Sequence, residues 1–160
     1  SIEGQVLQIF ADAYTPVVDS SAIPTGEIAS VEGTPMDFRT EKQIGQDIRA
    51  DFEQLHFTGG YDHNYVLGRP GEKKIMANAY CRESGIALEA ETDCCGVQFY
   101  AGNFIGEQTG KGGASYHDRS AFCLESQFYP NAVNEPDFPS PVVKAGDTYH
   151  TETSYRFYLR

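Results

Sequence analysis

The chain has 160 residues, the size of one ordinary domain, and 40% of them are hydrophobic, which suffices for a buried core and excludes a disordered protein. Twelve basic against 23 acidic residues give a formal net charge of -11, which repels polyphosphate and anionic lipid. Nucleic acid and membranes are therefore not expected partners, and the acidic excess by itself indicates only a solubilising surface.

The first half of the chain predicts one short helix. Within 41–55, apolar residues recur at helical spacing after Thr40-x-x-Gln43, a spacing that fits a capping box, although Gly45 disfavours a helix. We expect one or two helical turns there. The apolar residues are Ile44, Ile48, Phe52 and Leu55. Three segments rich in Gly, Pro, Asn, Asp and Ser predict long loops: 11–26, 102–118 and 129–147.

The stretch HFTGGYDHNYVL, residues 56–67, predicts a tight bend followed by a strand. Gly59 and Gly60 permit the bend, and the apolar residues from Tyr65 onward predict the strand. Asp62 therefore lies where a loop enters a strand. Turn chemistry explains an aspartate at such a position as well as a functional role does.

Period-two alternation of apolar and polar residues predicts an all-β chain. Residues 73–93 read as two strands around the turn at 83–85, and further strands are expected within 95–103, 120–128 and 149–160. In the last of these, aromatic and aliphatic residues at 155, 157 and 159 share one face. Short strands at this spacing favour two packed sheets, a β-sandwich.

Two polar residues inside these strands have alternative explanations. Alternation places Glu125 opposite the face of Phe122 and Leu124, either on a solvated outer face or as a partly desolvated carboxylate that exchanges protons near neutral pH. Gln98, between Val97 and Phe99, is either an edge residue or a ligand that donates to and accepts from one sugar hydroxyl.

Other patterns argue against metal, phosphate and disulfide chemistry. The glycine-rich segment 106–113 lacks the P-loop lysine spacing, and the four histidines are scattered, with His63 expected on the opposite face from Asp62. Cys94 and Cys95 are adjacent and cannot bridge without strain, so the four cysteines are expected to be buried free thiols. We expect no cofactor and no metal, and a reducing, cytoplasmic location.

Five segments resemble the aldose 1-epimerase (galactose mutarotase) family, in family order, from about residue 5 onward. They are ADAYTPVVDSSAIPTGEI, GTPMDFR, LHFTGGYDHNYVL, GVQFYAGNFIG and FCLESQFYPNAVNEPDFPS. The resemblance implies a large twisted β-sandwich, of which residues 1–160 form the C-terminal part of a single domain. It also implies interconversion of the α and β anomers of free aldoses such as galactose and glucose.

The resemblance assigns roles to three residues. Glu125 is the expected general base, Asp62 and Gln98 are expected to bind the monosaccharide, and Tyr61 is expected to add an aromatic wall. The family's catalytic acid is a histidine in a motif that the resemblance places upstream of Ser1, so we expect an N-terminal companion chain of the same domain. The alternative is a non-catalytic carbohydrate-binding sandwich that keeps Asp62 and Gln98 without turnover.

Overall fold

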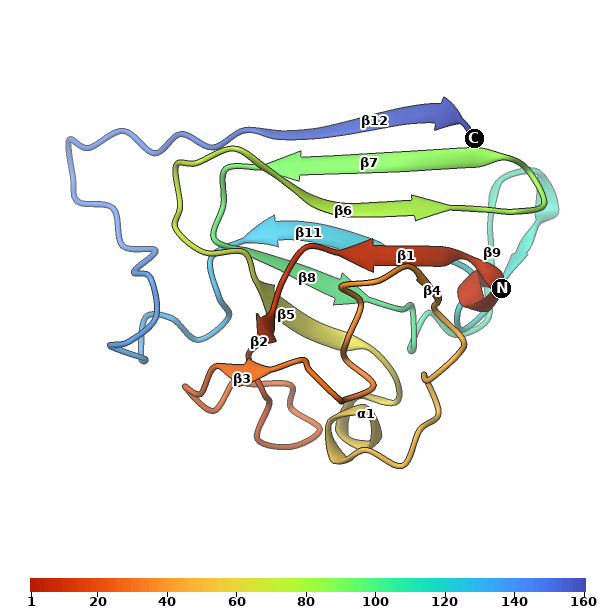
Figure 1. The fold of residues 1–160 in the computed structure, drawn as a ribbon, viewed down its shortest axis with the longest axis horizontal. Coiled ribbons are helices and arrows are strands. Elements are labelled where there is room, and N and C mark those ends of the chain that lie inside the picture. Colours follow the sequence, from red (N-terminus) through yellow and green to blue (C-terminus); the bar gives the residue numbers. More distant parts are fainter.

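The computed structural model describes all 160 residues, and two five-stranded antiparallel sheets face each other in it (Figure 1). In spatial order, the first sheet consists of β12 (Thr153–Leu159), β7 (Ile86–Thr92), β6 (Lys74–Tyr80), β1 (Val6–Ile9) and β4 (Lys42–Gln43). The second consists of β11 (Cys123–Gln127), β8 (Gly96–Tyr100), β5 (Asp62–Val66), β2 (Ala13–Tyr14) and β3 (Ala29–Ser30). The predicted all-β sandwich is confirmed.

The remaining elements are short. A hairpin of β9 (Gln108–Thr109) and β10 (Ser115–Tyr116) lies within the predicted loop 102–118, and the helices are η1 (Ile2–Gly4), α1 (Glu53–Thr58) and η2 (Lys111–Gly113). None of the helices has the length and apolar character needed to cross a membrane. The strands predicted within 73–93, 95–103, 120–128 and 149–160 are all present.

The helix predicted within 41–55 is wrong in position. Lys42 and Gln43 instead pair with Leu7 and Val6 as strand β4, so their backbone groups are used by a sheet and not by a capped helix. Ile44 and Ile48 are buried, but they lie in successive turns and not in a helix. The long-range strand pairing overrides the local helical spacing, and the only α-helix begins at Glu53.

Aromatic rings fill the space between the sheets. The rings of Tyr61 and Phe99 stack at 5.2 Å, and Phe38 packs edge-on against both, at 5.0 and 5.5 Å. Buried hydroxyls are satisfied by backbone, since Tyr61 Oη donates to the carbonyl of Pro35 and Tyr65 Oη to that of Met36. These bonds fix segment 33–39 against the core.

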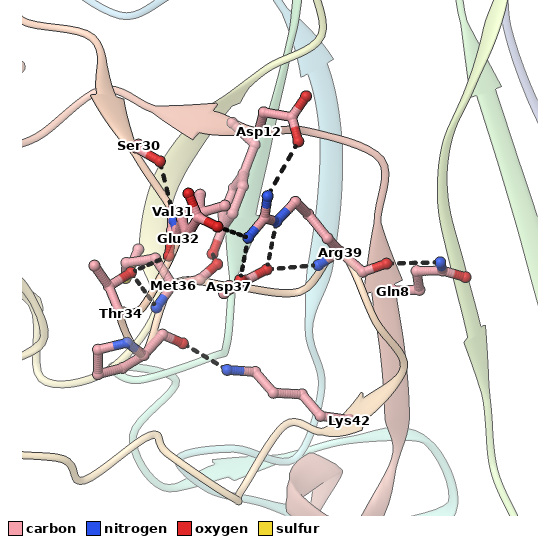
Figure 2. A network of polar contacts seen from close by, with 12 residues as sticks. Gln8, Asp12, Ser30, Val31, Glu32, Thr34, Met36, Asp37, Arg39 and Lys42 are labelled. Atoms are coloured by element: carbon pink, nitrogen blue, oxygen red, sulfur yellow. Dashed lines mark hydrogen bonds and ion pairs between the residues drawn. The ribbon is translucent and has the colours of Figure 1, made fainter.

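A network of charged groups holds the same segment from outside (Figure 2). The guanidinium of Arg39 donates to both carboxylate oxygens of Asp37, at 3.0 and 2.7 Å, and lies 3.6 Å from Asp12. Lys42 Nζ donates to the carbonyl of Pro35 at 2.7 Å. The hydrogen bonds from Arg39 lower the pKa of Asp37, so this carboxylate stays charged and the loop keeps its shape.

Removing a ring from the aromatic core should destabilise the fold strongly. Phe99 is fully buried, so Phe99→Ala should reduce the free energy of unfolding by about 3–5 kcal/mol through lost transfer energy and a residual cavity. The matched control is Phe104→Ala, at a ring 69% exposed, which should change it by about 0.5 kcal/mol or less. Urea denaturation measures both. Equal losses would contradict this placement of the core.

Candidate functional site

Three neighbouring strands bring the predicted site residues to one face of the second sheet. In the antiparallel register, Gln98 on β8 lies between Asn64 on β5 and Glu125 on β11. Asp62 is two residues before Asn64 and therefore shares its face. The intervening residues, including Phe99 and Leu124, point into the core, so this sheet has one apolar and one polar face.

Hydrogen bonds join the polar side chains across the strands. Gln98 Nε2 donates to Asp62 Oδ1 at 2.8 Å. Gln127 Nε2 donates to Gln98 Oε1 at 3.1 Å and to Asn64 Oδ1 at 3.3 Å. The amide groups are therefore ordered, and Asp62 receives an N–H at one of its two oxygens.

An open cleft of about 410 Å³ lies over this polar face. Its lining residues are Ala22, Asp62, Gln98, Tyr100, Phe104, Glu125, Gln127 and Pro130. The structure thus brings Asp62, Gln98 and Glu125 together, as the sequence predicts. Cleft residues that the sequence analysis missed include Gln127 and Tyr100, although each lies two residues from a predicted site residue and therefore on the same face.

The two carboxylates of the cleft have different surroundings. Asp62 is half-buried, and burial raises the pKa of its carboxyl group while the hydrogen bond from Gln98 opposes this, with burial prevailing. Glu125 is exposed, so of its two alternatives the solvated outer face holds and partial desolvation is wrong for this chain. The physical reason is that β11 is the edge strand of its sheet and has no neighbour beyond it.

The bend before Asp62 is built as predicted. Gly59 ends helix α1 in the left-handed conformation, with φ 65°, and Gly60 follows with φ 140°. A Cβ at Gly60 would lie 2.4 Å from Asn103 Oδ1. Asn103 Nδ2 closes the bend by donating to the carbonyls of Thr58 and Tyr61, both at 3.0 Å.

The expected aromatic wall comes from other residues. Tyr61 is fully buried, with its ring packed against Phe38 and Phe99, so its predicted place in the cleft is wrong. Tyr100 and Phe104 line the cleft instead. The backbone N–H of Phe104 donates to Tyr100 Oη at 2.9 Å, which fixes the loop that carries the exposed ring.

His63 faces away from the cleft, as predicted. Its ring is buried against Tyr14, and its Nδ1 accepts the backbone N–H of Asp62 at 3.2 Å. No three His, Cys, Asp or Glu side chains are grouped so as to hold a metal ion. The cysteines are free, as predicted, but burial holds only for Cys94 and Cys95, since Cys81 is partly exposed and Cys123, on edge strand β11, is exposed.

Comparisons with known proteins agree on one family. The profile of the family described as Aldose 1-epimerase matches residues 1–156. Galactose mutarotase from Bos taurus is 45% identical over 150 residues, which are 93% of this chain and 42% of that protein. Aldose 1-epimerase from Escherichia coli (strain K12) is 36% identical over 159 residues, 98% of this chain and 45% of that protein.

A solved structure shares the fold. The GalM/aldose epimerase homologue from C. elegans superposes with a TM-score of 0.81 at 27% identity, over 99% of this chain and 47% of that chain. The chain therefore spans less than half the length of the relatives it matches.

The buried imidazole of His63 should make stability depend on pH. Burial lowers its pKa from 6.5 to about 4, so between these values the unfolded chain binds a proton that the folded chain does not. Stability should fall as the pH decreases from 6.5 to 4. The contribution is about 3 kcal/mol, at about 1.4 kcal/mol per pKa unit.

Variants isolate this contribution from that of the carboxylates. His63→Phe keeps an aromatic ring at this position and should reduce the loss of unfolding free energy between pH 6.5 and 4. His117→Phe, at an exposed position, should leave this pH dependence unchanged. Urea denaturation at several pH values gives the slopes. The same slope in His63→Phe as in the unmodified chain would contradict the burial argument.

Proposed function

The chain belongs to the aldose 1-epimerase family, and we propose that it provides the general base and part of the sugar-binding surface for interconverting the α and β anomers of free aldoses such as galactose and glucose. The observation that carries this proposal is the convergence of Asp62, Gln98 and Glu125 on one open cleft. A cleft lined by carboxylates and amides offers both acceptors and donors to hydroxyl groups.

The reaction requires two proton transfers. A base takes the proton from the C1 hydroxyl while an acid protonates the ring oxygen, the ring opens to the aldehyde, C1 rotates about its bond to C2, and closure gives the other anomer. In this proposal Glu125, whose carboxylate is accessible from the cleft, is the base. A positioned base contributes about 10² to 10⁴ in rate.

Asp62 and Gln98 bind and orient the sugar in this proposal. Gln98 occupies one oxygen of Asp62, and the other oxygen makes no hydrogen bond within the chain, so it can accept from a sugar hydroxyl. Gln98 Nε2 has a second hydrogen for the oxygen of a hydroxyl. The exposed ring of Phe104 offers an apolar surface at the side of the cleft.

The second candidate is carbohydrate binding without turnover. It is favoured by one observation, that no histidine lines the cleft and the buried His63 points away from it. In the proposed enzyme, a companion segment supplies the catalytic acid. The two candidates therefore differ in whether a companion restores mutarotation.

The function is tested by replacing the proposed base. The 160-residue chain is co-expressed with the N-terminal portion of a galactose mutarotase, and mutarotation of α-D-glucose is followed by polarimetry. Glu125→Gln should reduce the rate at least about 10²-fold with nearly unchanged sugar affinity, because the amide keeps the shape but cannot accept the proton.

The control and the contrary outcomes are specific. Glu72→Gln, an exposed position outside the cleft, should retain the full rate. Mutarotation that survives in Glu125→Gln would exclude Glu125 as the base. Sugar binding by the unmodified complex without mutarotation would favour the non-catalytic candidate.

We also propose that a companion polypeptide covers an apolar face at the end of the first sheet. Tyr155 Oη donates to the carbonyl of Leu124 at 2.8 Å, so this face of β12 points toward the second sheet. Phe157 and Leu159 share that face and are 69% and 80% exposed. In Figure 1, β12 is the outermost strand of the first sheet, at the top of the view.

Substitution on this face should prevent the association. Phe157→Glu places a charge where the companion would pack, so the complex should dissociate in sedimentation velocity, whereas Tyr158→Glu, on the opposite face of β12, should leave it intact. The expected contact exceeds about 2,000 Å². A compact monomer of the chain alone with full mutarotase activity would contradict the companion.

A further inference from the structure

A continuous path of hydrogen bonds runs beneath the cleft and involves a residue outside the proposed catalytic set. Gln127 is the last residue of β11, and its Nε2 contacts two oxygens, Gln98 Oε1 at 3.1 Å and Asn64 Oδ1 at 3.3 Å. Gln98 continues the path to Asp62 at 2.8 Å. The path thus joins all three strands that form the polar face.

The path has only one consistent direction. A primary amide has two hydrogens on nitrogen, and those of Gln127 are both used on oxygen acceptors. The carboxylate of Asp62 can only accept, so Gln98 directs Nε2 toward Asp62, which leaves its Oε1 facing Gln127. The reversed amide of Gln98 would bring an oxygen against the carboxylate of Asp62 and an N–H group against that of Gln127.

The far end of the path is anchored in a space made by a glycine. Asn64 is 2% exposed, and its contact with Gln127 is the only hydrogen bond of its side chain. Gly96 pairs directly with Gln127 in the sheet, and a Cβ there would lie 2.4 Å from Asn64 Oδ1 and 3.0 Å from the ring of Tyr129. The missing side chain of Gly96 therefore lets Asn64 and Gln127 meet.

We propose that Gln127 is a positioning residue, an inference that rests on the proposed function. Gln127 holds the side chain of Gln98 so that the N–H group of Gln98 faces Asp62 and the cleft. A sugar hydroxyl then meets an acceptor, the free oxygen of Asp62, beside a donor, the second N–H of Gln98. Such a pair binds a hydroxyl group both as a hydrogen-bond donor and as an acceptor. Without Gln127, only the carboxylate of Asp62 still orients the amide of Gln98, so the hydrogen bond between these two residues weakens.

Titration of Asp62 tests the inference without sugar and without turnover. The N–H of Gln98 opposes the rise in the pKa of Asp62, so losing that bond should raise this pKa further. NMR of the carboxyl carbon in the 160-residue chain should show an upward shift in both Gln98→Leu and Gln127→Leu. The double variant should match Gln98→Leu alone, because Gln127 acts only through Gln98.

A control separates positioning from a general structural effect. Gln46→Leu, at an exposed residue outside the cleft, should leave the titration of Asp62 unchanged. In Gln127→Leu the side-chain amide resonances of Gln98 should also move. The complex of this variant with the N-terminal portion of a galactose mutarotase should bind galactose about threefold to tenfold more weakly than the unmodified complex, the range for one lost hydrogen bond.

The outcomes distinguish this inference from the proposed function. An unchanged Asp62 titration in Gln127→Leu, or additive shifts in the double variant, would overturn the positioning role. If the predicted shifts occur but galactose does not bind to the unmodified chain in complex with the N-terminal portion of a galactose mutarotase, the hydrogen-bond order stands, while both the proposed function and the role in sugar recognition fail.

Discussion

The antiparallel register of β5, β8 and β11 is the constraint on which both the core and the cleft depend. Because side chains alternate between faces, the pairing of Gln98 with Asn64 and Glu125 also places Phe99 opposite His63 and Leu124 on the inner face. A register slip of one residue would expose the side chain of Phe99 to water and bury the polar side chains of Asn64, Gln98 and Glu125. The energy that fixes the site therefore comes mostly from the apolar face behind it, where the ring of Phe99 is stacked.

Asp62 shows how this coupling works at one residue. Its neighbour Tyr61 is held by ring stacking in the core and by its hydroxyl bond to Pro35, and the preceding bend is closed by Asn103. The backbone at Asp62 is thereby fixed from both sides, and a site on strands of this kind is more rigid than one on loops. This placement partly desolvates the carboxylate of Asp62, and the hydrogen bond from Gln98 offsets part of the desolvation cost.

Much of this arrangement follows from the sequence, because alternation is a local property. It predicted the four strand regions from residue 73 onward, and it correctly placed Glu125 opposite Leu124. The position of β4 depends instead on pairing with β1, more than 30 residues away, which no local pattern contains. Exposure of Glu125 was one of two open alternatives, since alternation gives the face of a side chain but not what covers that face. Tyr61 was a different error, because it lies in the bend before β5, where strand alternation does not fix the direction of a side chain.

The exposed carboxylate of Glu125 and the exposed apolar face of β12 lie close together, because the edge strands of the two sheets are joined. Tyr155 on β12 donates to Leu124, and the hydroxyls of Ser126 and Thr153 share a hydrogen bond at 2.5 Å. Burial, and then the charge of Glu125, raise the pKa of Tyr155. In the proposed complex, a companion that packs on β12 therefore lies beside Glu125. One contact would then bury apolar surface, shield the base from water and bring a proton donor to the open side of the cleft.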